Sequence, residues 1–325
     1  MSKPVLISGI QPTGRLHLGN YLGALKNFVE LQNSSKYDCY FFVADYHSLT
    51  VDFDPETKAQ ETLDVAKAYL AAGINPKKSL IFSQSDIKGS GDLMWILNVI
   101  APVGEMERMT QYKDKAKSQP ANINMGLLNY PLLMAADIFL YNAKFVPVGD
   151  DQLQHLELAR TLARKFNKRF GQTFIEPQSI LTKTPRVMSL DNPEKKMSKS
   201  SPNSCLFLDD SPEEIESKIK RAVTDSGSEI KYDRQNKAGV SNLLEIYSEL
   251  SGKAIPAIEK MCAGKGYGQF KTDLAKVVTD ALKPFREVKS KKLNIKSMLD
   301  AGAKKAQKIA EKKMGEVKQK IGLLQ

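Results

Sequence analysis

The sequence predicts an α/β fold: a Rossmann-like, doubly wound parallel sheet followed by a C-terminal helical domain. Short apolar runs alternate with helical patterns in the first half of the chain, and this alternation is typical of parallel sheets. Beyond residue 205 the strand patterns fade and helical spacing continues to the end. The length of 325 residues suits two domains. We therefore expect a first domain over residues 1–204, a helical domain over 205–290 and a basic helix over 291–325.

The predicted strands are short runs rich in apolar residues, and they cover residues 5–8, 39–47, 80–85 and 145–148. Apolar residues at helical spacing predict helices over residues 56–72, 212–223, 239–251, 254–263, 270–283 and 297–321. In doubly wound sheets, ligands bind beyond the carboxyl ends of the strands. Polar or glycine-rich segments fall at three of these ends, at residues 9–19, 45–47 and 83–85. The sequence therefore predicts a ligand site along this edge.

Charge and cysteine content narrow the class of protein. The formal charge is +11, and residues 283–325 hold 13 Lys and Arg against 4 Asp and Glu. A polyanionic partner such as RNA would explain this basic end, and so would a solvated amphipathic helix. The cysteines Cys39, Cys205 and Cys262 lie far apart, which argues against a disulfide scaffold, a structural metal site or an iron–sulfur cluster. No apolar run is long enough to span a membrane, so we expect a cytoplasmic protein.

The loop before the first helix, 9-GIQPTGRLHLGN-20, has the composition of a nucleotide-binding loop. Gly14 and Gly19 let the backbone approach a flat or phosphorylated ligand, because a Cβ atom would stand in the way. The following helix N-terminus offers free N–H groups to phosphate, and His17 adds a donor. The dinucleotide fingerprint GxGxxG is absent, which argues against a dehydrogenase. A helix entry without a ligand would also explain His17.

A second segment, 195-KKMSKSSPN-203, combines lysines and hydroxyl groups with no acidic residue. Lys196 and Lys199 could fold over a triphosphate and stabilise the charge that builds on its leaving group. Ser198 and Ser200 add hydroxyl donors without bulk. A solvated turn would explain the same composition. A phosphate site is favoured only because the chain also contains the glycine-rich loop at residues 9–20.

The two segments together resemble the signatures of class I aminoacyl-tRNA synthetases. HLGN at 17–20 is similar to the HIGH signature, with Asn20 in place of its final histidine, and KMSKS at 196–200 matches the second signature. Asn20 can still donate a hydrogen bond, but its charge cannot be switched. Nearly the whole chain resembles the bacterial-type tryptophanyl-tRNA synthetase family, most closely at 9-GIQPTGRLHLGNYLGAL-25, 130-YPLLMAADI-138, 146-VPVGDDQ-152 and 224-TDS-226.

The resemblance implies an ATP site, with ATP entering as a substrate together with Mg²⁺. Gly19 would lie under the adenine, Gly23 would leave room for the ribose, and Asp151 would bind the ribose hydroxyls. Gln11 would meet the reacting carboxylate or the α-phosphate. The residues that hold the triphosphate and act in catalysis would be Lys115, Lys196 and Lys199, with Gln11. The full ATP-binding set is Gln11, Thr13, His17, Gly19, Asn20, Gly23, Gly149, Asp151, Lys196, Met197, Ser198 and Lys199.

The resemblance also implies a tryptophan site made of His47, Tyr130, Met134, Asp137, Val146, Val148 and Gln152. Asp137 would accept the indole N–H, and Gln152 would help hold the α-amino group. The residues themselves agree, because Asp137 follows Met134, Ala135 and Ala136 in an apolar context where a carboxylate needs a partner. A helix cap or a structural salt bridge would also explain Asp137. We interpret His155, on the helix after GDDQ, as structural.

The activity implied is tryptophan–tRNA ligation: tryptophan reacts with ATP to form an adenylate and pyrophosphate, and then acylates the 3′ end of its tRNA. Family members are homodimers, so we expect residues 88–135 to form a helical insertion at the dimer interface and residues 205–290 to read the anticodon. The C-terminal helix could pack back on the first domain.

Three other functions remain open at this point. A tyrosine-specific relative would share the chemistry, but would need a phenol-binding pair where this chain has Asp137. A small-molecule adenylyltransferase would not need the basic helical half. A non-catalytic RNA-binding protein would be expected to lack the KMSKS lysines, which are all present here.

Overall fold

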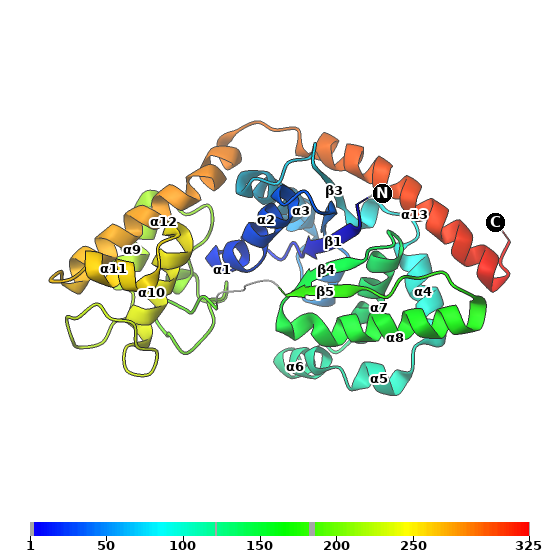
Figure 1. The fold of residues 1–325 in the computed structure, drawn as a ribbon, viewed down its shortest axis with the longest axis horizontal. Helices are drawn as coiled ribbons and strands as arrows, with labels where there is room; N and C mark the ends of the chain where they lie inside the picture. Colours follow the sequence, from blue (N-terminus) through cyan, green and yellow to red (C-terminus); the bar gives the residue numbers. More distant parts are fainter. Residues whose placement is uncertain (1–2, 121, 182–185, 325) are drawn as a thin grey trace.

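The computed structural model describes residues 3–120, 122–181 and 186–324 (Figure 1). Residues 121 and 182–185, inside the predicted insertion and first domain, lie outside these ranges. Five parallel strands form one sheet in the order β3-β2-β1-β4-β5. They are β1 (Val5–Ile10), β2 (Asp38–Val43), β3 (Ser79–Ser83), β4 (Phe145–Val148) and β5 (Gln178–Leu181).

The strand order confirms the predicted doubly wound sheet. The chain runs outward from β1 through β2 to β3, and then adds β4 and β5 on the other side of β1. The direction of winding therefore reverses between β1 and β4, which are paired at Leu6 and Phe145. Loops leave the carboxyl ends of these two strands on opposite sides and open a crevice, which is where such sheets bind ligands.

The strand ends differ from the predicted ones. β1 continues through Gly9 to Ile10, whereas β2 stops at Val43 instead of residue 47 and β3 stops at Ser83 instead of residue 85. Short 3₁₀ turns take over there, at His47–Thr50 and Gln84–Asp86. The prediction lacks β5, because its sequence QSIL has little apolar alternation and its pairing with β4 is what makes it a strand.

Helices cover both faces of the sheet. On one face lie α2 (Lys26–Asn33) and α3 (Pro55–Ala72), whose buried side chains join those of β1 and β2 in one apolar core. The opposite face carries α4 (Ser90–Ile100), α7 (Met125–Phe139) and α8 (Leu153–Phe170) over a second core. The short helices α5 (Val103–Glu107) and α6 (Thr110–Ser118) lie beyond them, at the bottom of Figure 1.

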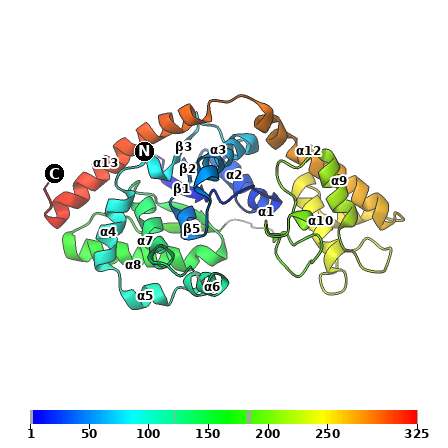
Figure 2. The same ribbon diagram turned by 180° about the vertical axis from the view of Figure 1, so that it is seen from behind.

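A helical lobe lies beside the sheet, at the left of Figure 1 and the right of Figure 2. Its helices are α9 (Pro212–Arg221), α10 (Ala238–Ser251), α11 (Ile255–Met261) and α12 (Tyr267–Ser290). The prediction that the helix starting at residue 270 ends at residue 283 is wrong, because this helix, α12, continues through Pro284. Leu282 and Phe285 on either side are buried, and this packing outweighs the hydrogen bond that proline removes. No helix within the described ranges is both long and apolar enough to cross a membrane.

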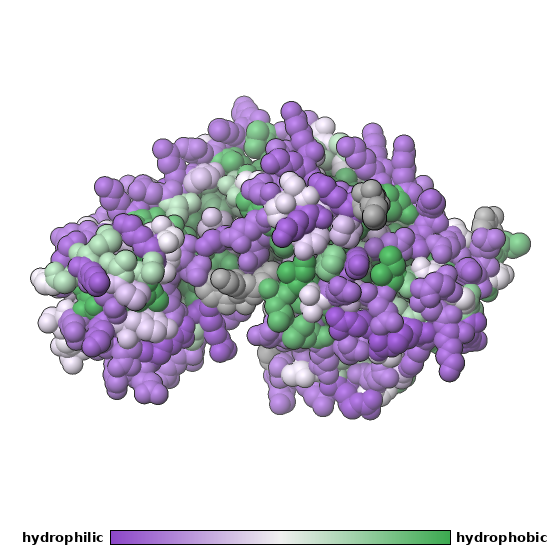
Figure 3. Space-filling model, viewed as in Figure 1, coloured by the Kyte–Doolittle hydropathy of each residue, from purple (hydrophilic) through white to green (hydrophobic). Residues whose placement is uncertain are grey.

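The last helix, α13 (Ile295–Ile321), runs from the lobe back along the sheet and lies against β3 (Figures 1 and 2). Gly302 makes the close approach possible, because a Cβ atom there would stand 1.7 Å from the Ile81 carbonyl oxygen. Further along, the buried Lys313 donates from Nζ to the carbonyl oxygen of Thr173 (3.0 Å). The outer surface on this side is mainly hydrophilic (Figure 3).

We expect Gly302→Ala to lower the free energy of unfolding by about 1–3 kcal/mol, because the new methyl group forces α13 away from the backbone of β3. Gly315→Ala in the same helix is the matched control. Its added Cβ would meet nothing within 4 Å, so alanine should stabilise the helix by about 0.5–1 kcal/mol. Urea denaturation measures both, and equal effects of the two substitutions would contradict this packing of α13.

Candidate active site

A cavity of about 330 Å³ lies in the crevice between β1 and β4. The structure brings every residue of the predicted tryptophan set to its wall: His47, Tyr130, Met134, Asp137, Val146, Val148 and Gln152. Gln11, Gly23 and Gly149 from the predicted ATP set also line it. The apolar part of the wall comes from the carboxyl end of the sheet and from α7. The sequence of α7 is mostly apolar, and most of its side chains are buried.

Asp137 lies on α7 at the buried end of the cavity, with 5% of its surface exposed. Its Oδ2 accepts a hydrogen bond from Gln84 Nε2 (2.7 Å) and lies 3.0 Å from His47 Nε2. Burial raises the pKa of this carboxyl group, and the His47 and Gln84 contacts oppose the rise. Because both neighbours meet Oδ2, Oδ1 is the oxygen that remains for a donor inside the cavity.

Gln84 is a site residue that the sequence analysis missed. It is almost fully buried, its Oε1 accepts from the His47 backbone N–H (3.3 Å), and its amide holds Asp137. The sequence feature that could have identified Gln84 is its position just after β3, in the segment 83–85 that was already predicted to lie at the ligand-binding edge of the sheet. A glutamine in an apolar strand end needs hydrogen-bond partners, and here they are two residues of the site.

Near Tyr130, about two turns of α7 away from Asp137, this end of the cavity wall is polar. Tyr130 Oη lies 2.8 Å from His155 Nε2, His155 Nδ1 lies 2.9 Å from Gln152 Oε1, and Gln152 Nε2 donates to Asp151 Oδ2 (2.9 Å). Lys115 Nζ stands over the ring of Tyr130, 4.3 Å from its centre. His155 thus joins two residues of the predicted tryptophan site, and its interpretation as merely structural is incomplete.

The first signature lies directly beside the cavity and is held in place by its own side chains. His17 Nδ1 accepts from the Gly19 N–H (3.1 Å), and Asn20 Oδ1 accepts from the His17 N–H (3.0 Å), so the two residues cap the short helix α1 (Leu18–Asn20). His17 can therefore be both a helix-entry residue and a donor to phosphate, because the cap uses Nδ1 and leaves Nε2 with its hydrogen. The Asn20 amide nitrogen remains available as a donor in the same way.

The tertiary structure brings the two signatures together. Leu18 N–H donates to the Leu206 carbonyl oxygen (2.8 Å), and Leu208 N–H donates to that of Leu16 (2.9 Å). Lys199 Nζ reaches back to the carbonyl oxygen and the hydroxyl of Thr13, at 3.1 Å each. The lysine loop (residues 195–203) thus lies against the glycine loop (residues 9–20), as a shared triphosphate site requires.

Within the lysine loop the side chains point in different directions. Lys196 and Ser198 are exposed, whereas Met197 is 3% exposed and belongs to the apolar core. The prediction that Met197 contacts ATP therefore applies only to its backbone atoms, because its side chain is in the core. Burial lowers the pKa of Lys199, although Glu61 nearby opposes this, and burial likewise lowers the pKa of Lys115.

His17 should titrate well below neutral pH. Burial, with Lys199 and Lys196 nearby, lowers its pKa to about 4, so the folded state prefers neutral imidazole. Its contribution to stability is complete above the unfolded value of 6.5 and is lost as the pH falls from 6.5 toward 4. Imidazole NMR on wild type and on His17→Asn identifies its signal. Added triphosphate should raise the midpoint, and a midpoint above 6.5 in the free protein would contradict this environment.

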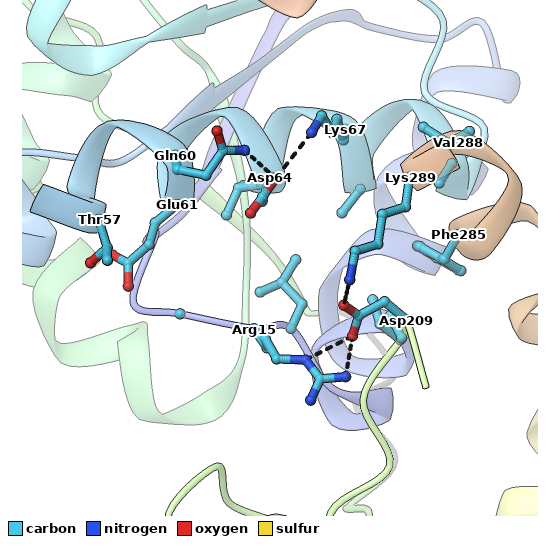
Figure 4. A pocket seen from close by; sticks show the side chains of 16 residues that line it. Arg15, Thr57, Gln60, Glu61, Asp64, Lys67, Asp209, Phe285, Val288 and Lys289 are labelled. Carbon is cyan, nitrogen blue, oxygen red and sulfur yellow. Dashed lines mark hydrogen bonds and ion pairs between the residues drawn. The ribbon is translucent and has the colours of Figure 1, made fainter. Parts of the chain in front are cut away.

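A larger cavity, of about 440 Å³, lies elsewhere, between α3, the loop at Gly14–Leu16 and the end of α12 (Figure 4). Figure 4 shows Arg15 and Lys289 reaching the same carboxylate, that of Asp209, while Gln60 and Lys67 meet Asp64. Both oxygens of Asp209 are therefore paired with cations of the protein itself. The cavity between β1 and β4 is the functional candidate, because it holds the residues of the predicted tryptophan site and a buried carboxylate, that of Asp137, with one oxygen left for a ligand.

A crevice at the reversal of a parallel sheet, with HLGN and KMSKS loops brought together by the tertiary structure, defines a class I aminoacyl-tRNA synthetase. The corresponding family model, "tRNA synthetases class I (W and Y)", matches residues 2–283. The chain belongs to this family of tryptophan and tyrosine enzymes.

Its similar proteins are named for tryptophan. A tryptophan–tRNA ligase of Bacillus anthracis is 50% identical, over 98% of each chain, and one of Bacillus subtilis is 46% identical over 99% of this chain and 98% of its own. Among solved structures, tryptophanyl-tRNA synthetase of Mycoplasma pneumoniae gives a TM-score of 0.87 at 37% identity, covering 100% of this chain and 99% of its own. The Campylobacter jejuni enzyme, complexed with ADP and tryptophan, gives 0.84 at 38% identity and covers 98% of this chain and 99% of its own.

Proposed function

We propose that this protein is a tryptophan–tRNA ligase, which activates L-tryptophan with ATP and transfers it to the 3′ end of its tRNA. One observation carries the choice of amino acid. A buried carboxylate, Asp137, closes the apolar end of the cavity and keeps one oxygen for a donor. An indole N–H is such a donor. A site built to bond its substrate rejects amino acids that leave this group unpaired.

In the activation step, the tryptophan carboxylate attacks the α-phosphorus of ATP and pyrophosphate leaves. The carboxylate is already ionised, so the step needs positioning and charge stabilisation rather than a general base. We assign Gln11 to the reacting groups, and Lys115, Lys196 and Lys199 to the triphosphate, which brings Mg²⁺ as part of the substrate. Asp151 would bind the ribose, while His17 Nε2 and the Asn20 amide would donate to phosphate oxygens.

The helical lobe and the basic end suit tRNA. Figure 3 shows a recess between the helical lobe and the rest of the molecule. Backbone hydrogen bonds join the HLGN segment to residues 206–208 at the start of the lobe, so a polyanion could contact both signatures and the lobe. We propose that the lobe, residues 205–290, reads anticodon bases and that α13 belongs structurally with the first domain. Three buried free thiols agree with a reducing compartment, and we propose the cytoplasm.

The test of this function is ATP–pyrophosphate exchange with each of the twenty amino acids, followed by acylation of tRNA. Exchange that depends on tryptophan alone is expected. Exchange with tyrosine instead would keep the class and overturn the assignment of Asp137. Exchange with no amino acid would refute the proposed activity and would favour a non-catalytic RNA-binding protein.

We further propose a homodimer formed through the segment 88–135. Five large apolar side chains among the described residues of this segment are exposed: Trp95 (70%), Val99 (68%), Val103 (67%), Ile123 (53%) and Met125 (66%). They lie on α4, on α5, just before α7 and at its first residue, and α4 and α5 are on the side of the molecule away from the helical lobe (Figure 1). Such a group of apolar side chains is typical of an interface between subunits.

Trp95→Glu is expected to convert the dimer into a 36.2-kDa monomer, because it places a charge in the apolar interface. Light scattering after gel filtration measures the mass. Met261→Glu, an exposed apolar position in the helical lobe, is the control and should remain dimeric. Trp95 is the sole tryptophan of the chain, so its fluorescence should shift on dilution of wild type. A wild-type monomer at all concentrations would contradict the proposed interface.

A further inference from the structure

Four side chains form a continuous hydrogen-bonded row at the polar end of the cavity: Tyr130, His155, Gln152 and Asp151. Tyr130 and Gln152 line the cavity, whereas His155 is 1% exposed and lies behind them. His155 joins α8 to α7, since Tyr130 belongs to α7. A buried histidine with both ring nitrogens engaged fixes the hydrogen positions of its partners.

The chemistry of the groups decides each hydrogen in this row. The carboxylate of Asp151 can only accept, so the Gln152 atom that faces it must be the amide nitrogen. Gln152 Oε1 therefore faces His155 Nδ1, and Nδ1 must be the donor because an amide oxygen can only accept. In the neutral ring Nε2 then has no hydrogen and accepts the hydroxyl hydrogen of Tyr130.

The surroundings of His155 support the neutral ring. Burial is the main cause that lowers its pKa, to about 4; Lys115 and His47 lower it further and Asp151 opposes them. Burial also raises the pKa of Tyr130, which therefore keeps its hydroxyl hydrogen. The row holds one arrangement of hydrogens across the neutral range of pH.

We propose that His155 is a positioning residue that makes the polar end of the cavity specific for an ammonium group. The inference rests on the proposed activation of tryptophan and deepens it. Because Tyr130 gives its only hydroxyl hydrogen to His155, the lone pairs of Oη remain for the cavity. Gln152 Oε1 likewise keeps a second lone pair beside the one that accepts from His155 Nδ1, whereas its NH₂ group is held by Asp151. Lone pairs of two acceptor atoms at the cavity wall, Tyr130 Oη and Gln152 Oε1, then attract the α-ammonium group and repel the carboxylate, so that the carboxylate lies toward the ATP side.

The row therefore sets the direction in which the amino acid lies, and the indole end is set separately by Asp137. A neutral His155 matters for this, because a charged ring would donate from Nε2 and turn the Tyr130 hydroxyl hydrogen toward the ligand. It would also add a positive charge beside Lys115, which already stands over the Tyr130 ring. Both changes would repel an ammonium group.

His155→Phe tests the proposal with two ligands, L-tryptophan and indole-3-propionate, which lacks the ammonium group. Calorimetry should show tryptophan binding weakened by about 10- to 100-fold, while the binding of indole-3-propionate changes by less than about two-fold. In exchange kinetics the KM for tryptophan should rise more than kcat falls. Equal weakening of both ligands, or no change in either, would overturn the proposal.

Two more variants separate positioning from folding. His155→Gln can still donate and accept, and should recover part of the affinity for tryptophan. Tyr130→Phe combined with His155→Phe should lose little more than His155→Phe alone, because Tyr130 acts through the hydroxyl group that His155 orients. Additive losses would also overturn the proposal. Wild type that exchanges with another amino acid would instead refute the proposed function, and this is visible before any variant is made.

Discussion

Lys199→Ala is expected to lower the rate of tryptophan-dependent ATP–pyrophosphate exchange by about 10²–10³-fold. The charge on the leaving pyrophosphate increases in the transition state, and a fixed ammonium group in a partly buried place stabilises it more than the ground state. Lys199 has such a place, because its Nζ is anchored by the carbonyl oxygen and the hydroxyl of Thr13. The loss should therefore fall mainly on kcat, with a smaller change in the KM for ATP.

Lys195→Ala is the matched control for this substitution. Lys195 belongs to the same loop, but its side chain is exposed and its bonds in the loop are made by the backbone. It should leave the exchange rate nearly unchanged, whereas Lys199→Arg should restore part of the loss because it keeps the charge. If Lys195→Ala and Lys199→Ala slow the reaction alike, general charge rather than the Lys199 position governs it. Thermal melts of both proteins exclude unfolding as the cause.

Asp137→Asn is expected to raise the KM for tryptophan by roughly 10- to 150-fold, the range of a hydrogen bond to a charged group. The asparagine oxygen would take the place of Oδ2, where Gln84 and His47 meet it. Its NH₂ group would then point into the cavity toward the indole N–H, so that two donors face each other. Steady-state exchange at varied tryptophan measures the effect.

Stability should respond differently from binding. Burial raises the pKa of Asp137, so the fold prefers the neutral form, and the contribution of this group to stability is lost as the pH rises through its folded value. A neutral asparagine should thus leave the melting temperature equal or higher at neutral pH. Asp38→Asn, at the exposed start of β2, is the control and should change neither quantity. An unaltered KM in Asp137→Asn would remove the main support for tryptophan as the substrate.

The parts of the fold that sequence predicted well are those with a strong local pattern. α3 and the strand at Phe145–Val148 have the predicted extents because their apolar spacing is regular. β5 was missed because an edge strand with mixed polarity depends on its partner. The predicted end of α12 failed at Pro284, where burial of neighbouring side chains outweighs a local rule.

The site divides in the same manner. Its charged and polar groups could be selected from motifs, because phosphate chemistry demands lysines and backbone amides near each other. Gln84 and His155 belong to no motif, and their importance arises from hydrogen bonds to residues on other elements. Such partners cannot be deduced from spacing along one segment.

The sequence by itself determined the alternating elements, the loop chemistry and the buried acid in an apolar helix, because these depend on neighbouring residues. The tertiary structure alone decided that winding reverses between β1 and β4, that Leu18 pairs with Leu206, and that Gly302 meets Ile81. These contacts join residues far apart in the chain. Their free energy depends on how whole elements pack, and a local pattern of residues does not contain that information.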